Sequence, residues 1–187
     1  NSFSLPRSSA ARDADRQAGT GDTKRRTDLL LNMPFHHVAY ATRDVDATTD
    51  FYERLMGFPL VHTEIQALGD SWIRHVFYDT GEDECIAFFQ FDGIGEQPDY
   101  HTDVSDGVGL PVWINHAAFR ATKDQQETVR ARMTNEGIDP VMEQDHGWCH
   151  SLYYLDPNGI MVELCRDTPG FVPDPSEARR LLAVDPL

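Results

Sequence analysis

The hydrophobic pattern along the chain changes its period several times after residue 33. A short apolar strand opens at His37, and apolar residues with helical spacing follow Asp44. Three short apolar strand candidates then cover 58–66, 72–79 and 85–91, with turn residues between them. This succession predicts the order β-α-β-β-β for the first half of the chain.

The same order repeats from residue 116 onward. A second apolar strand opens at His116, a helical stretch follows, and strand candidates cover 138–144, 149–155 and 160–165. The duplication predicts an α+β fold made of two paired βαβββ modules. We expect the modules to form a curved, barrel-like mixed sheet with the helices outside.

The predicted ends of the two helices also match between the copies. Asp44 and Asp124 follow the opening strands and are suited to cap the helices, while Gly57 and Gly137 supply the stops. The stop follows the opening histidine by 20 residues in the first copy and by 21 in the second.

The segments outside the modules have different compositions. The first 32 residues are rich in Ser, Ala, Arg, Asp, Thr and Gly without an apolar period, which predicts a flexible arm. A targeting peptide is the alternative, but the acidic residues in this segment disfavour it. A short helical stretch is expected near 175–183. The predicted organisation is a flexible N-terminal arm at 1–32, a first module at 33–92, a linker at 93–111, a second module at 112–167 and a C-terminal tail at 168–187.

Charge and cysteine usage exclude several classes of partner. The formal net charge of −15 repels phosphate backbones, so we expect no nucleic-acid binding. No apolar run approaches the ~20 residues of a membrane helix, so no membrane partner is expected. Three cysteines, Cys85, Cys149 and Cys165, contain no CxxC pair, which favours a reducing, cytoplasmic location.

Three side chains form a predicted metal site. His37 and His116 occupy matching places in the two copies, and pseudo-twofold packing of the modules would bring them together. Glu163 lies within the apolar strand 160–165, where a carboxylate is costly unless it is paired or bound to a cation. Two imidazoles and one carboxylate suit Fe(II), Mn(II) or Zn(II).

Two neighbouring positions limit this ligand set. His36 competes with His37, but it falls on the opposite face and Asn115 stands in its place in the second copy. At the place of Glu163, the first copy is expected to have an aromatic residue or, after a shift, Gln90. Three protein ligands then leave open positions on one divalent metal ion, which favours catalysis over a closed structural site.

Three segments carry a resemblance to a known family. They are FHHVAYATRDVDATTDFYERLMGF, the strand INHAAF and the segment LYYLDPNGIMVEL. Over about residues 34–167 the chain resembles the vicinal oxygen chelate superfamily, which includes glyoxalase I, bleomycin-resistance proteins and extradiol dioxygenases. The resemblance implies the paired βαβββ fold and metal binding by His37, His116 and Glu163.

The C-terminal part of the second copy is similar to the type I extradiol dioxygenase pattern. His146, Leu152, Tyr153, the turn at 156–159 and Glu163 stand at the places of that pattern. The similarity implies that Tyr153 hydrogen-bonds a catecholate oxygen and that His146 lies beside the ring or O₂. It also favours Fe(II) as the metal. Tyr154 remains an alternative to Tyr153, since turn geometry decides which of the two faces the pocket.

The chain departs from the dioxygenase pattern at two places. Gln144 stands where a small residue is expected. No histidine occurs at 83–85, where those enzymes carry an acid–base histidine, and His75 or His101 would have to replace it.

The resulting hypothesis is an extradiol-type dioxygenase acting on a catechol-like small molecule with O₂. The alternatives are a glyoxalase- or epimerase-type metalloenzyme and a non-catalytic, resistance-type binding protein. We expect the metal site to form within one chain and the protein to be a homodimer.

Overall fold

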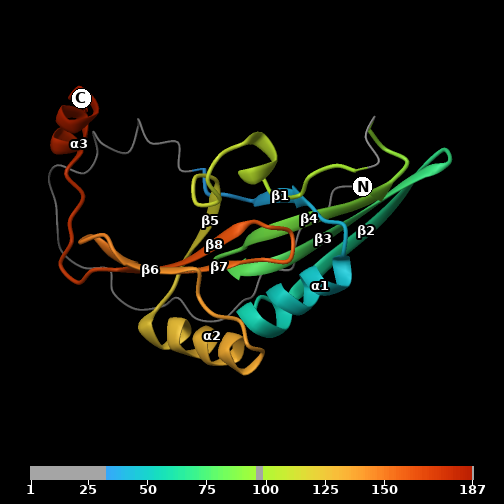
Figure 1. Cartoon of the computed structure of the whole chain (residues 1–187), viewed down its shortest axis with the longest axis horizontal. Helices are drawn as coiled ribbons and strands as arrows, with labels where there is room; N and C mark the ends of the chain where they lie inside the picture. Colours follow the sequence, from blue (N-terminus) through green and yellow to red (C-terminus); the bar gives the residue numbers. More distant parts are fainter. Residues whose placement is uncertain (1–32, 96–98, 187) are drawn as a thin grey trace, which may run out of the picture. The chain divides into compact units, whose positions relative to one another are not determined.

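The structure is a computed structural model that describes residues 33–95 and 99–186 (Figure 1). The predicted N-terminal arm, 1–32, lies outside the described residues. A single unit begins at Phe35 and continues to the C-terminus.

The first module has the predicted order of elements. Its strands form a four-stranded sheet in the order β1-β4-β3-β2, in which β1 runs parallel to β4 and the other neighbours are antiparallel (Figure 1). The elements are β1 (His37–Ala41), α1 (Val45–Thr49), its π-helical continuation η2 (Asp50–Met56), β2 (Leu60–Leu68), β3 (Ser71–Gly81) and β4 (Glu84–Asp92).

The second module repeats this arrangement, with the sheet order β5-β8-β7-β6 and a parallel β5–β8 pair. The α+β fold of two βαβββ modules is therefore confirmed. The described strands pair as two separate four-stranded sheets rather than one continuous sheet. The elements are η3 (Asp106–Val108), β5 (His116–Arg120), α2 (Lys123–Asn135), β6 (Met142–Asp145), β7 (Cys149–Leu155), β8 (Met161–Asp167) and α3 (Pro175–Leu182).

The predicted N-cap agrees with the structure in the first module and differs in the second. The Asp44 carboxylate accepts a hydrogen bond from the amide of Ala47 at 2.9 Å, as expected of an N-cap. In the second module Thr122 is the N-cap, and it forms a capping box with Gln125. The prediction that Asp124 caps this helix was therefore wrong: Asp124 lies within the first turn.

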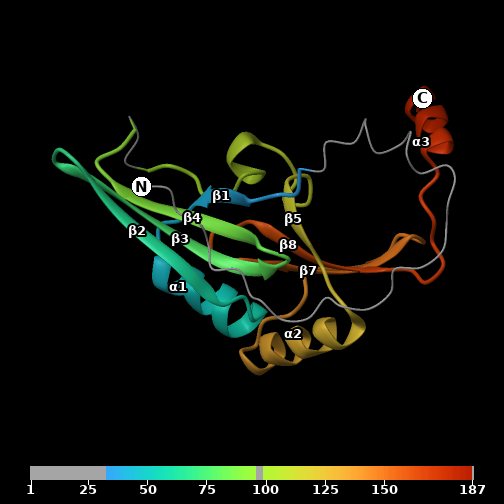
Figure 2. The ribbon, with the colours of Figure 1, turned by 180° about the vertical axis from the view of Figure 1, so that it is seen from behind.

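The helices α1 and α2 lie on the same side of both sheets in two opposite views (Figures 1 and 2). Because side chains alternate along a strand, every second residue faces this helical side and enters the core. Leu152, Tyr154, Val162 and Leu164 do so in the second module. We call the other side of each sheet the open face; it carries the residues that alternate with these. The core residues of the first module include Tyr52, Leu55, Met56, Val76, Tyr78, Ile86 and Phe88.

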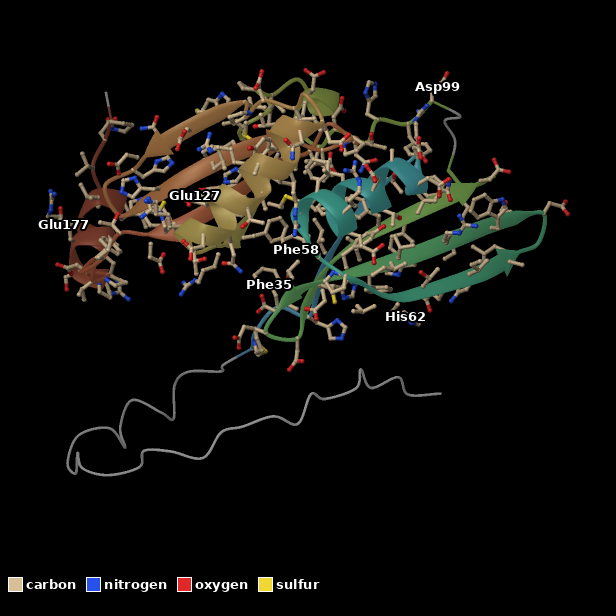
Figure 3. All side chains as sticks on the ribbon, turned by 90° about the horizontal axis from the view of Figure 1, so that it is seen from below. Phe35, Phe58, His62, Asp99, Glu127 and Glu177 are labelled. Carbon is tan, nitrogen blue, oxygen red and sulfur yellow. The ribbon has the colours of Figure 1, made fainter. Side chains whose placement is uncertain are left out.

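Hydrogen bonds between buried side chains join the two modules. The Tyr52 hydroxyl donates to Asp156 Oδ2 at 3.0 Å, and Asn158 Nδ2 donates to Thr48 Oγ1 at 3.1 Å. Burial raises the pKa of the Asp156 carboxyl, although its hydrogen bonds oppose the shift. The rings of Phe58 and Phe119 add an edge contact at 5.0 Å between centroids (Phe58 is labelled in Figure 3).

The C-terminal tail contains the predicted short helix, α3. Asp174 caps it by accepting hydrogen bonds from the amides of Ser176 and Glu177, and no α3 side chain is buried. Among the described helices, none has the length and apolar content needed to cross a lipid bilayer.

The Tyr52–Asp156 hydrogen bond should contribute measurably to stability. Tyr52→Phe removes a donor from a buried carboxylate, so we expect the free energy of unfolding in urea to fall by about 1.5–3 kcal/mol. Tyr40 packs against the same core. As a control, Tyr40→Phe should cost about 0.5 kcal/mol or less. Equal losses for the two variants would contradict a specific role for this hydrogen bond.

Candidate metal centre

Glu163 and His116 meet on the open face of the second sheet. Glu163 pairs with Ala118 of the parallel neighbour β5, and His116 lies two residues earlier on the same face. His116 Nε2 is 3.0 Å from Glu163 Oε2. Glu163 is only 5% exposed, and its chain neighbours Val162 and Leu164 belong to the apolar core. Strand alternation therefore presents one buried carboxylate to one imidazole.

The Glu163 carboxylate and the His116 imidazole each have a second hydrogen-bond partner that orients them. The Ser151 hydroxyl donates to Glu163 Oε1, and His116 Nδ1 lies 3.1 Å from the carbonyl oxygen of Trp113. A carbonyl can only accept, so the Nδ1 of His116 carries a proton, and its Nε2 is the nitrogen that a metal ion would bind in place of a proton shared with Glu163. This arrangement is typical of histidines that bind metals.

The predicted catalytic pair lies beside this site. Tyr153 pairs with Glu163 across the β7–β8 ladder, and its hydroxyl is 3.0 Å from His146 Nε2. Burial raises the pKa of Tyr153, so its hydroxyl keeps its proton. Tyr154 points into the core instead, and its hydroxyl has no hydrogen-bond partner among the described residues. The structure thus places Tyr153 rather than Tyr154 on the open face.

Cys149 is a neighbour of the site that sequence reasoning missed. Ligand atoms of Cys149, His146 and Glu163 all lie within 4.8 Å of one another. The signal was present in the strand period, since Cys149, Ser151 and Tyr153 are alternate residues of β7. Burial raises the pKa of the nearby Cys165 thiol to about 12.

Among the described residues, no hydrogen bond or ring contact joins His37 to His116 or Glu163. The Nδ1 of His37 is 2.8 Å from Nδ1 of His36, and the His37 ring contacts those of His75 and Phe77, all in the first module. The cluster of potential metal ligands found within 4.8 Å among the described residues includes neither His37 nor His116. That one chain assembles all three ligands stays a prediction.

The first-copy position that matches Glu163 is Ala87. Ala39 of β1 pairs with Ala87 of β4, just as Ala118 of β5 pairs with Glu163 of β8. The expectation of an aromatic residue or Gln90 at this place was wrong, because the sequence did not fix the register between β1 and β4. The matching position therefore supplies no carboxylate.

His75 is a second buried histidine on the open face of the first sheet. It is 5% exposed, and its ring stacks on Phe89 with 3.6 Å between centroids. Its Nδ1 is 3.4 Å from Glu64 Oε1, whereas its buried Nε2 has no partner among the described residues. Burial lowers the pKa of His75, and Glu64 opposes this shift. The other histidine considered, His101, is 70% exposed and lies near Asp103.

These side chains fit a divalent cation. The open faces present imidazole nitrogens and a buried carboxylate, which are donors that bind Fe(II), Mn(II) and Zn(II). An unpartnered buried nitrogen on His75 is also a feature that a cation would satisfy.

Comparison with known proteins agrees with this architecture. The profile of the Glyoxalase/Bleomycin resistance protein/Dioxygenase superfamily matches residues 35–164. No match to a curated protein was found.

Solved structures with similar folds share little sequence with this chain. A glyoxylase/bleomycin resistance protein/dioxygenase domain from Frankia sp. EAN1pec has a TM-score of 0.54 at 16% identity, covering 74% of this chain and 95% of that one. The antibiotic-binding protein TnmS3 from Streptomyces sp. CB03234 has a TM-score of 0.52 at 16% identity, covering 74% and 99%.

A third structure of this kind contains a metal. A variant of the fosfomycin resistance protein FosX from Listeria monocytogenes, complexed with Mn(II) and 1S,2S-dihydroxypropylphosphonic acid, has a TM-score of 0.51 at 17% identity, covering 79% and 97%. At these identities the likeness concerns the fold. The profile match spans most of the chain, which therefore belongs to the Glyoxalase/Bleomycin resistance protein/Dioxygenase superfamily.

Proposed function

We propose that the protein is an enzyme that binds one divalent metal ion through His37, His116 and Glu163. The observation that carries the proposal is the 3.0 Å contact between His116 Nε2 and the buried Glu163 carboxylate. A charge within such an apolar strand needs compensation, and a cation supplies it. When bound, the metal acts as a Lewis acid toward oxygen atoms of the substrate.

We further propose that His37 reaches this site from a second copy of the chain. Within one chain the ring of His37 contacts those of His75 and Phe77 in its own module, whereas His116 and Glu163 meet on the other. Apolar side chains beside His116 and His146 remain exposed, including Trp113 and Trp148. A two-fold dimer that faced the open face of β1 in one copy toward β5 and β8 of the other would cover them and form two equal sites.

The substrate class follows from the groups around the metal. Three protein ligands leave positions for a small molecule that chelates through two adjacent oxygens. Tyr153 keeps its proton and is placed to donate a hydrogen bond to one of these oxygens, and His146 holds the Tyr153 hydroxyl in position. The FosX complex, which contains Mn(II) and a ligand with vicinal hydroxyls, supports this class of ligand.

Two reaction classes fit this description, and they differ in the number of metal coordination positions that their reactants need. Ring cleavage of a catechol-like diol on Fe(II) needs two positions for the diol and one for O₂, and the Tyr153–His146 pair supports it. A glyoxalase- or epimerase-type reaction needs no O₂ position. The partnerless nitrogen of His75, which offers a further ligand, favours the second class.

The first prediction concerns metal content. Purified wild-type protein should contain a divalent ion by elemental analysis, and His116→Ala should lose it while keeping its fold by circular dichroism. The exposed His101 is outside the site, so His101→Ala is the control and should retain the metal. Full metal content in a folded His116→Ala protein would defeat the assignment.

The shared site predicts complementation between two defective chains. His37→Ala and His116→Ala homodimers should each lose the metal. A heterodimer of the two, isolated with different affinity tags, regains one complete site, because His37 comes from one chain and His116 with Glu163 from the other. If the isolated heterodimer stays metal-free while both variants are folded dimers, the second-copy arrangement is wrong.

A third prediction concerns chelation by vicinal oxygens. 4-Nitrocatechol should bind the metal-loaded wild type, which is visible as a change in its absorption spectrum, and should not bind His116→Ala. Binding of equal strength to both proteins would contradict chelation at this metal. Oxygen uptake in an electrode then distinguishes the classes, since only ring cleavage consumes O₂.

A further inference from the structure

We propose that His75 is a fourth protein ligand of the metal, so that each copy contributes two donors to every site. His37 and His75 would come from one chain, and His116 and Glu163 from the other. This inference rests on the metal site proposed above and extends it to a residue outside the predicted triad.

The strongest observation is the buried ring nitrogen of His75. Its Nε2 has no hydrogen-bond partner among the described residues, although the side chain is 94% buried. Leaving a polar atom buried without a partner is energetically costly. Coordination to a cation would satisfy the lone pair of this nitrogen.

The second observation is the position of Glu64. Its Oε1 lies 3.4 Å from His75 Nδ1, so the carboxylate holds the proton on Nδ1 and leaves a lone pair on Nε2. Metal-binding histidines usually donate their other ring N–H to a carboxylate or carbonyl in this way. His116 has the matching arrangement with the Trp113 carbonyl.

The third observation is that His75 lies close to His37. The two ring centroids are 5.8 Å apart, although β4 lies between their strands. His37 pairs with Cys85 and His75 with Phe89, so the residue between these two levels of β4 is Ala87. A methyl side chain there leaves room for two imidazoles to approach the same point.

Four protein donors change what the metal can do. An octahedral ion would keep two positions, which is the number that the two adjacent oxygens of a chelating substrate occupy. No position then remains for O₂ beside a bound substrate. The arrangement therefore favours isomerase- or lyase-type chemistry on a vicinal-oxygen substrate over ring cleavage.

The test counts the imidazoles on the metal. The full-length protein is loaded with Cu(II), and pulsed electron paramagnetic resonance with ¹⁵N-histidine labelling reports the coordinated rings. Wild type should show three coordinated imidazoles, which we assign to His37, His75 and His116. His75→Phe should show one coordinated imidazole fewer. His62 lies on the same open face, on the outer strand β2 (Figure 3). His62→Gln is therefore the matched control and should leave the count unchanged.

Zinc affinity gives an independent readout. In competition with a chelating dye, the zinc affinity of His75→Phe should be at least about 10-fold weaker than that of wild type. Glu64→Gln keeps His75 in place, and its zinc affinity should fall by about 10–100-fold. An unchanged imidazole count and affinity in both variants, with metal bound, would overturn the His75 proposal alone. Failure of wild type to bind Cu(II) or zinc would overturn the metal site itself.

Discussion

The site depends on one constraint: the negative charge of the buried Glu163 carboxylate must be compensated. Glu163 is buried in a strand whose neighbouring residues fill the core, and His116 and Ser151 are its partners. Removing one partner from a buried ion pair typically costs about 3–5 kcal/mol, so such a group persists only with well-placed partners. In the proposed site, a metal ion completes this compensation and turns a costly group into a reactive centre.

The fold explains why the remaining donors lie elsewhere. Each module buries one sheet face under its helix and leaves the other open, and the proposed donors of both modules lie on the open faces. In one chain the ring contact of His37 with His75 lies in the first module, and the contact of His116 with Glu163 lies in the second. In the proposed dimer, metal binding, association of the two copies and the covering of exposed apolar residues are one coupled event.

The sequence predicted the elements well because hydrophobic period and turn residues are local signals. The duplication, the order of helices and strands along each module and the Asp44 cap all follow from these signals. Register is not a local signal, so Ala87 could not be identified as the counterpart of Glu163. The His75–Glu64 pair could not be predicted from the sequence either, because it depends on the register between β2 and β3. The Thr122 cap was missed although Gln125, three residues later, completes its capping box.

Anomalous X-ray diffraction at the absorption edge of the bound metal tests the central claim most directly. The account predicts a peak about 2.0–2.3 Å from His116 Nε2 and a Glu163 oxygen, with His37 of a second copy completing the site. A peak coordinated by His146 and Cys149 without any histidine of a second copy, or no peak in crystals grown with the metal, would contradict it.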